Sequence, residues 1–195
     1  MKMNFRNFWM YYSYSIVRIF VDQIVIAIFA LAVALGTAAS VGSLGAEKSN
    51  VLTIVTSVFS ILFFLFMVGE LCFKQGAADK EKTDVGRFER DDLTGLYMGL
   101  LANIPNFILT LGYTVFYFID ATRGSVSGFF GLAVKLICGE YLGLFSIKIG
   151  GDTLSTAYPY IYFLAILPCV FAAWLGYYLG ISGKIIIKPT KKDLE

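Results

Sequence analysis

The run from Leu93 to Ile119 contains no charged residue. It is about as long as a tilted helix needs to cross the hydrocarbon core of a bilayer. Its small and polar residues recur at steps of three or four, so in a helix they lie on one narrow face between large apolar side chains. The residues of this seam are Gly95, Gly99, Asn103, Asn106 and Thr110. The pattern predicts a transmembrane helix with a small and polar seam.

Composition extends this interpretation to the whole chain. Hydrophobic residues make up 57% of the 195 residues and charged residues 15%, whereas about a quarter of an ordinary soluble domain is charged. The longest hydrophilic stretch, residues 74–92, is too short for a separate soluble domain. We therefore expect one all-α integral membrane domain over residues 1–195, embedded in the lipid bilayer. The formal charge of +2 is small and scattered, which argues against a nucleic-acid-binding surface.

Cysteine and histidine usage limits the chemistry that the chain can carry. Cys72, Cys138 and Cys169 lie in different segments, which indicates neither a disulfide framework nor a thiolate metal site. The sequence has no histidine, which is the commonest general base and zinc ligand. It also has no phosphate-binding loop and no hydrolase nucleophile motif. We expect a non-enzymatic protein that uses neither a metal nor a cofactor.

Four apolar segments are long enough to cross the membrane, and they predict a four-helix transmembrane bundle. They are residues 24–46, 51–73, 93–119 and 158–183. Residues 1–20 carry aromatic side chains at helical spacing, which is typical of a helix in the headgroup region, continuous with the first span or bent into it. Residues 74–92 then form a solvated loop or a short helical hairpin tip, with Gly76 and Gly86 among its breaks. Its acidic residues, among them Asp79, are compensated by lysine and arginine. We interpret these residues as a solvated face or partner surface rather than as an ion site.

Residues 124–147 are ambiguous because Lys135 and Glu140 interrupt an otherwise apolar run. Their five-residue spacing is poor for pairing on a helix, and an unpaired charge is costly inside a membrane. We expect a short peripheral or re-entrant helix within an extracytoplasmic connection, residues 120–157. The two charges then either line an outer vestibule or form the polar face of a surface helix.

Basic residues beside the spans predict the orientation of the chain. The N-terminal region, the 74–92 loop and the 184–195 tail are richer in lysine and arginine than the other connections. The positive-inside rule places all three in the cytoplasm, which requires an even number of crossings. The prediction is a multi-pass protein of the cell membrane with both termini cytoplasmic. A five-span alternative would place the lysine-rich tail outside.

The best candidates for a ligand site surround the proline of the third span. Pro105 removes one helical hydrogen bond, so we expect a kink there, with the amides of Asn103 and Asn106 beside it. These groups either bind a solute or ion at mid-membrane, or only repair the broken helix and pack against its neighbours. Glu70 either binds a proton or cation, or forms an interfacial pair with Lys74 one turn later.

Small-residue seams suggest what the protein does. Gly176 and Gly180 form a G-x-x-x-G step in the last span, and Gly95 and Gly99 lie in the third. Such positions let helices approach closely, and their number suggests contacts beyond one small bundle. The first hypothesis is an accessory subunit of a membrane transport or export complex, acting through helix–helix contacts with other membrane subunits or with copies of itself. The alternative is a small-solute transporter or solute-binding membrane component that uses the broken helix from Asn103 to Asn106.

Overall fold

The computed structural model describes residues 5–39, 46–87, 89, 91–119, 125–149 and 152–183. Within these ranges the protein is helical apart from one antiparallel hairpin of two-residue strands, β1 (Lys148–Ile149) and β2 (Asp152–Thr153). The prediction of an all-helical protein is confirmed.

Three helical segments of the described chain are long and apolar enough to cross a membrane. They are α1 (Phe5–Ala39), α3 (Ala46–Asp84), and α9 (Tyr162–Ile181) preceded by the 3-10 turn η3 (Pro159–Ile161). Two further segments reach that length only as bent pairs, so the described residues hold three candidate spans, or up to five if each pair counts as one.

The two bent pairs differ in how sharply they turn. Helix α4 (Thr94–Ala102) meets α5 (Ile104–Phe118) at 49°. Helix α6 (Val126–Ile137) meets the segment formed by η2 (Gly139–Tyr141) and α7 (Leu142–Phe145) at 86°. The single-turn helix α8 (Leu154–Ala157) then leads from the hairpin towards η3. Both breaks lie within apolar sequence, so they bring backbone turns into the interior of the fold.

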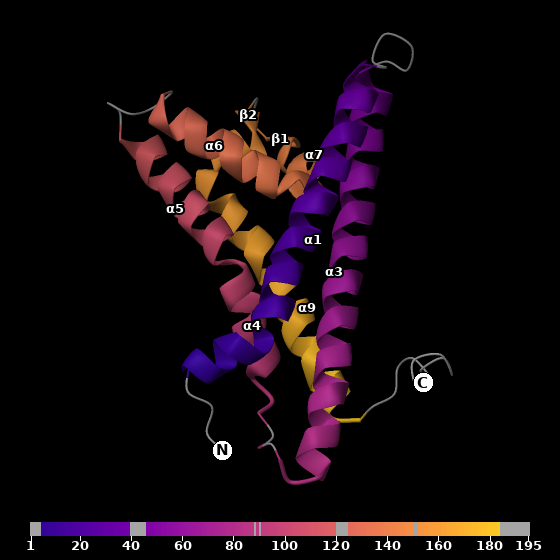
Figure 1. The fold of residues 1–195 in the computed structure, drawn as a ribbon. Helices are drawn as coiled ribbons and strands as arrows, with labels where there is room; N and C mark the ends of the chain where they lie inside the picture. Colours follow the sequence, from indigo (N-terminus) through magenta and orange to yellow (C-terminus); the bar gives the residue numbers. More distant parts are fainter. Residues whose placement is uncertain are drawn as a thin grey trace.

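The helices run between two ends of the molecule. Figure 1 shows the start of α1, the end of α3, the start of α4 and the end of α9 at one end, drawn at the bottom. Helix α6, the hairpin and the end of α5 lie at the opposite end. Helix α9 makes its most extensive contacts with α3 and α4. Helix α9 therefore packs mainly between α3 and α4, whereas η2, at the second break, contacts α1 and α3.

Helix α1 joins the predicted interfacial helix, residues 1–20, to most of the predicted first span, residues 24–46, as the continuous alternative expected. It is one helix from Phe5 to Ala39, and its first turns run across the lower end of the molecule before the rest rises (Figure 1). No glycine or proline occurs between Phe5 and Leu35, so no residue in that stretch disfavours helix. Residues 1–4 and 40–45 lie outside the described part.

Of the two alternatives for residues 74–92, the loop is corrected over the first half, because helix α3 continues there to Asp84. Gly76, which we expected to break the helix, instead packs against α9, where an added methyl group would overlap the carbonyl oxygen of Tyr177. The helix ends at Asp84, and Gly86 terminates it two residues later with a φ of 71°, which suits glycine. Its N–H donates to the carbonyl of Thr83 at 2.9 Å, and that of Arg87 to the carbonyl of Lys82 at 2.9 Å. Gly86 rather than Gly76 is the helix terminator.

The predicted kink in the third span is confirmed, and it is centred on Asn103. The Asn103 N–H still donates to the carbonyls of Gly99 and Leu100, at 3.2 and 3.1 Å, while its own carbonyl accepts the first bond of α5, from Phe107 at 2.9 Å. Pro105 lies in the first turn of α5, where its missing N–H leaves no helical bond unmade. The proline therefore starts the second helix rather than interrupting a single one.

The four glycines predicted to pack lie at helix interfaces inside this chain. Gly95 and Gly99 of α4 face α9, and Gly176 and Gly180 of α9 face α3. At each position an added methyl group would lie less than 3.0 Å from backbone atoms of the facing helix. The seams that suggested external partners are therefore occupied by the protein's own helices.

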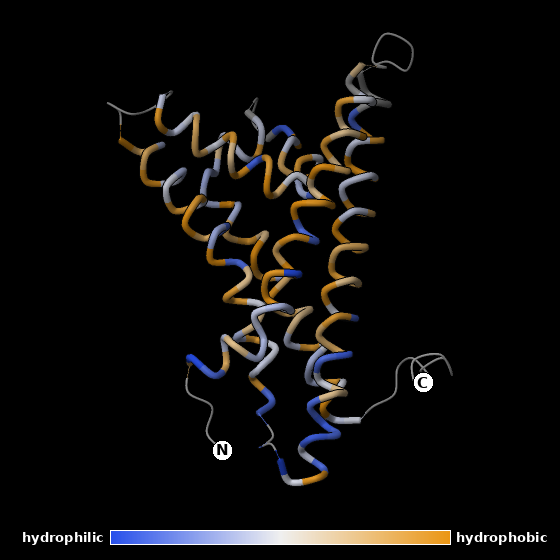
Figure 2. Tube along the Cα trace, viewed as in Figure 1, coloured by the Kyte–Doolittle hydropathy of each residue, from blue (hydrophilic) through white to orange (hydrophobic). Residues whose placement is uncertain are grey.

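The outward faces of the helices carry large apolar side chains. Figure 2 shows hydrophobic positions along most of the helices and hydrophilic positions gathered at the lower end of α3. Exposed apolar residues occur on every long helix, among them Val25, Phe29, Leu62, Phe66, Ile108 and Phe171. Contiguous apolar exposure on this scale marks contact with lipid rather than water. The described chain thus has the surface of a membrane-associated multi-pass protein.

Candidate functional site

A line of four buried polar side chains crosses the middle of the fold, and we call it the polar chain. It consists of Asn103, Asn106, Gln23 and Glu140, each at most 2% exposed. The Asn106 amide donates to Asn103 Oδ1 at 2.9 Å and to Gln23 Oε1 at 2.7 Å. The Gln23 amide in turn donates to Glu140 Oε1 at 3.2 Å. Residues that are distant in sequence thus form one hydrogen-bonded group.

The two helix breaks supply the ends of the polar chain. Asn103 occupies the joint between α4 and α5, and Glu140 lies in η2, at the bend between α6 and α7. Gly139 allows η2 to approach α1 closely, because a methyl group there would lie 2.6 Å from the carbonyl oxygen of Ala27. Gln23 of α1 therefore lies between the two breaks and joins them.

Two acceptor oxygens of the polar chain have no hydrogen-bond partner among the described residues. They are Glu140 Oε2 and Asn106 Oδ1, and both are buried. None of the described lysines and arginines forms an ion pair with Glu140. The site is therefore short of donors and of positive charge, and it can accept a proton, a cation or a solute that carries hydrogen-bond donors.

Asp79 provides a contrast, because this buried carboxylate is surrounded by donors. It is fully buried and accepts hydrogen bonds from the hydroxyls of Tyr11 at 2.9 Å, Tyr12 at 2.7 Å and Tyr177 at 3.1 Å. The ammonium of Lys82 lies 3.6 Å from Asp79 Oδ1 and also bonds the Tyr11 hydroxyl. We call this group the tyrosine clamp. It corrects the prediction that Asp79 belongs to a solvated loop, and it ties α1, α3 and α9 together.

The structure places the predicted site residues in two different environments. Asn103 and Asn106 come together in the polar chain, whereas Pro105 contributes the start of α5. Glu70 is instead paired with Lys74 at 2.8 Å, with 37% of its side chain exposed. That geometry agrees with the interfacial pair rather than with a buried ligand. Asn103 also donates to the Gly99 carbonyl at 2.9 Å, so this amide does take part in repairing the break.

Sequence reasoning missed Gln23 and misjudged Glu140. Glu140 is fully buried, so the interpretation that it belongs to the polar face of a surface helix is wrong. The sequence did contain a signal that Glu140 is buried, because this lone carboxyl group follows a glycine within an apolar run. Gln23 gave no comparable signal, because it stands beside Asp22 at the start of a predicted span.

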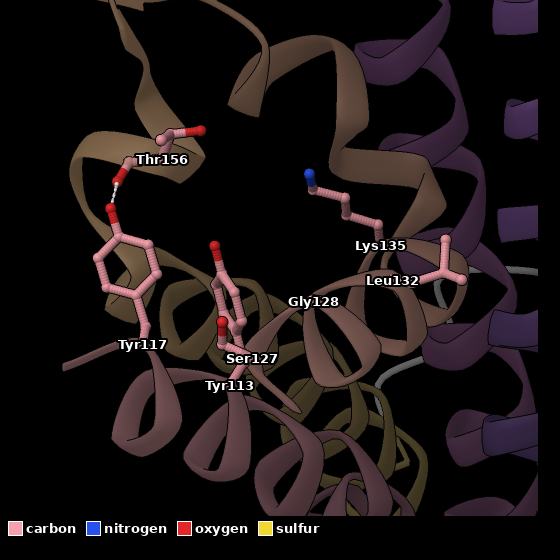
Figure 3. Close-up of a pocket in the computed structure, with 8 residues that line it drawn as sticks. Tyr113, Tyr117, Ser127, Gly128, Leu132, Lys135 and Thr156 are labelled. Atoms are coloured by element: carbon pink, nitrogen blue, oxygen red, sulfur yellow. Dashed lines mark hydrogen bonds between the residues drawn. The ribbon is translucent and has the colours of Figure 1, made fainter. Parts of the chain in front are cut away.

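An open hollow of about 490 Å³ lies at the upper end of the fold, between α5, α6 and α8 (Figure 3). Its polar lining includes Tyr113, Tyr117, Ser127, Lys135 and Thr156. The Tyr117 hydroxyl donates to the Thr156 carbonyl at 3.0 Å, and Figure 3 shows the Lys135 ammonium directed into the hollow. Lys135 pairs with no carboxylate among the described residues. The hollow thus has a largely apolar lining with a few polar groups and one lysine.

Aromatic packing links this hollow to the region of Glu140. Tyr113 lines the hollow, and its ring centroid lies 5.9 Å from that of Tyr162. Tyr113, Tyr162, Tyr141 and Cys138 belong to one buried cluster. The hydroxyls of Tyr141 and Tyr162 are buried without a hydrogen-bond partner among the described residues.

Comparison with protein families, with characterised proteins and with solved structures finds no match for this chain.

Proposed function

We propose that this protein binds and moves a small polar solute across the membrane, and that the polar chain is its binding site. The observation that carries this proposal is the pair of unpartnered acceptors, Glu140 Oε2 and Asn106 Oδ1, where two helix breaks meet. A solute with hydrogen-bond donors or positive charge is complementary to these oxygens.

The free-energy cost of burying these oxygens without hydrogen-bond partners supports this proposal. A buried polar atom without a partner destabilises a fold by roughly 1–3 kcal/mol, and ionisable or amide groups within membrane segments commonly mark solute or ion pathways. Broken helices at mid-membrane supply such groups in many transporters. A bundle that needed stability alone would satisfy these oxygens or replace them with apolar groups.

We further propose four crossings, made by α1, α3, the α4–α5 pair and α9. In this arrangement α6, η2 and α7 fold back into the outer half, which places the hollow towards the outside. The basic regions at the N-terminus, at the end of α3 and after α9 then share the cytoplasmic side, as the positive-inside rule requires. The shared end of these helix termini in Figure 1 supports this layout.

The accessory-subunit hypothesis is our second proposal. Its original support was the number of glycine seams, and these seams are occupied inside the chain. Contacts with another subunit would therefore use the lipid-facing apolar surfaces. Gentle purification from native membranes tests it, because a stoichiometric second protein would favour the subunit role.

The first test of solute binding replaces both asparagines with leucine, a side chain of similar size. Small molecules that co-purify with the wild-type protein are released by denaturation and identified by mass spectrometry. We expect the Asn103→Leu/Asn106→Leu variant to lose the bound compound, and proteoliposomes containing it to lose uptake of that compound. Glu70→Gln is the matched control, because Glu70 lies at an exposed ion pair and its variant should retain both. A folded double variant that still binds and transports would contradict the proposal.

A further inference from the structure

We propose that Glu140 carries a proton on Oε2 and exchanges it with water in the hollow, which makes the buried site proton-coupled. This inference deepens the proposed function and rests on it for its physiological role. The proton itself can be measured without knowledge of the solute.

The surroundings of Glu140 contain no positive charge among the described residues. Gln23 of α1 supplies a single amide donor at 3.2 Å. The titratable groups nearby are Tyr141, the next residue in the chain, Cys138, two residues earlier, and Cys169 of α9. Helix α3, which bonds α7 through Ser57 and the Gly143 N–H at 2.8 Å, is uncharged from Ser49 to Gly69.

An ionised carboxylate in this environment would be buried with neither a cation nor a full set of donors. Such a state is strongly disfavoured, whereas the neutral acid is not. The acid also provides the O–H donor that the polar chain lacks. Asp79 differs because three tyrosine hydroxyls and Lys82 surround it, a donor set suited to an ionised carboxylate.

A bound metal cation fits this site less well than a proton. Hard cations require about six oxygen ligands, and the polar chain offers two unpartnered oxygens, on Glu140 and Asn106. A proton needs only one of them. In the exchange step, hydronium transfers its proton to Glu140 Oε2 and leaves as water, with no change in oxidation state.

The tyrosine cluster provides a route between the hollow and Glu140. Figure 3 shows the Tyr113 hydroxyl facing the hollow, and Tyr113 packs against Tyr162. The hydroxyls of Tyr162 and Tyr141 are unpartnered within the described structure, so each can donate and accept. Tyr141 is the direct neighbour of Glu140. The rings of Tyr162, Phe145 and Tyr141 pack in succession, so this aromatic cluster extends from the hollow to the residue beside Glu140, and we place the proton path along it.

Infrared difference spectroscopy of the full-length protein in lipid tests this proposal as the pH is raised. We expect the carbonyl stretching band of a protonated carboxyl group in the wild-type spectrum, shifted in D₂O and lost as the group ionises. The band should be absent from Glu140→Gln, present but shifted in Glu140→Asp, and unchanged in Asp79→Asn. The last variant separates Glu140 from Asp79, the other fully buried carboxyl group among the described residues.

Absence of the band from the wild-type protein at every pH would overturn the proposal, as would a band that persists in Glu140→Gln. If Glu140→Gln does not fold, the Glu140→Asp shift assigns the band. A Glu140-dependent band together with unchanged solute binding in Asn103→Leu/Asn106→Leu would keep the proton site and reject the solute site. If Asn103→Leu/Asn106→Leu loses solute binding but the wild-type protein shows no Glu140-dependent band, the solute site is kept and the proton site is rejected.

Discussion

At the scale of the residue, two fully buried carboxylates have opposite surroundings. Asp79 is held by three tyrosine hydroxyls and lies near Lys82, whereas among the described side chains Glu140 has one donor, the Gln23 amide. A carboxylate with many donors stabilises a fold, because hydrogen bonds to charged groups are stronger than neutral ones. One with few donors is available to a proton or a ligand. The same chemical group thus serves as a structural clamp at one position and as a candidate site at the other.

The clamp predicts that Asp79→Asn destabilises the protein. The variant loses the charge that three hydroxyls and Lys82 share, so we expect the free energy of unfolding to fall by about 2 kcal/mol. Thermal unfolding in detergent measures this as a lower midpoint. Asp84→Asn is the control, because Asp84 forms an exposed pair with Lys80 and such pairs contribute little. Equal midpoints for the two variants would show that the clamp is not stabilising.

At the scale of the element, glycine has two different effects in this chain. Gly86 ends α3 because it adopts a positive φ, whereas Gly76 lies within α3 because α9 packs against it. Spacing identified Gly95, Gly99, Gly176 and Gly180 as positions of close approach, and their partners turned out to be α9 and α3. Composition alone does not distinguish a glycine that ends a helix from one that lets another helix approach.

The α3–α9 interface predicts unequal effects of adding one methyl group to a helical glycine. Gly176→Ala would overlap the Gly69 backbone, and we expect the free energy of unfolding to fall by about 2 kcal/mol through overpacking. Gly36→Ala adds a methyl group that meets no atom within 4 Å, so its helix propensity should leave stability unchanged or higher. Unfolding midpoints of both variants in detergent provide the comparison. An unchanged unfolding midpoint for Gly176→Ala would mean that α3 and α9 can move apart to make room for the added methyl group.

At the scale of the whole molecule, the ends of α1, α3 and α9 that border the basic regions lie together. The breaks at Asn103 and Cys138 leave α4–α5 as a bent rod and turn α7 sharply away from α6. The polar chain lies where these bent elements meet α1. A bundle of straight helices would not bring Asn106, Gln23 and Glu140 into one group.

The four-crossing layout predicts the side from which introduced cysteines react. In a background with Cys72, Cys138 and Cys169 replaced by alanine, a membrane-impermeant maleimide should label Lys148→Cys in intact cells. Arg87→Cys and Lys191→Cys should react only after permeabilisation, although Lys191 lies outside the described residues. Permeabilised cells provide the control, because all three cysteines should then react. Labelling of Lys191→Cys in intact cells would instead support five crossings.

The sequence by itself determined the membrane class, the kink near Pro105 and the positions of the packing glycines. Hydropathy, proline geometry and glycine spacing are local properties, so they can be read within one segment. Only the tertiary structure decided that Gln23 joins Asn106 to Glu140, and that tyrosines of α1 and α9 surround Asp79. These partners lie 67 to 117 residues apart in the chain. Which buried polar group finds donors depends on how helices pack across such distances, and segment hydropathy carries no information about it.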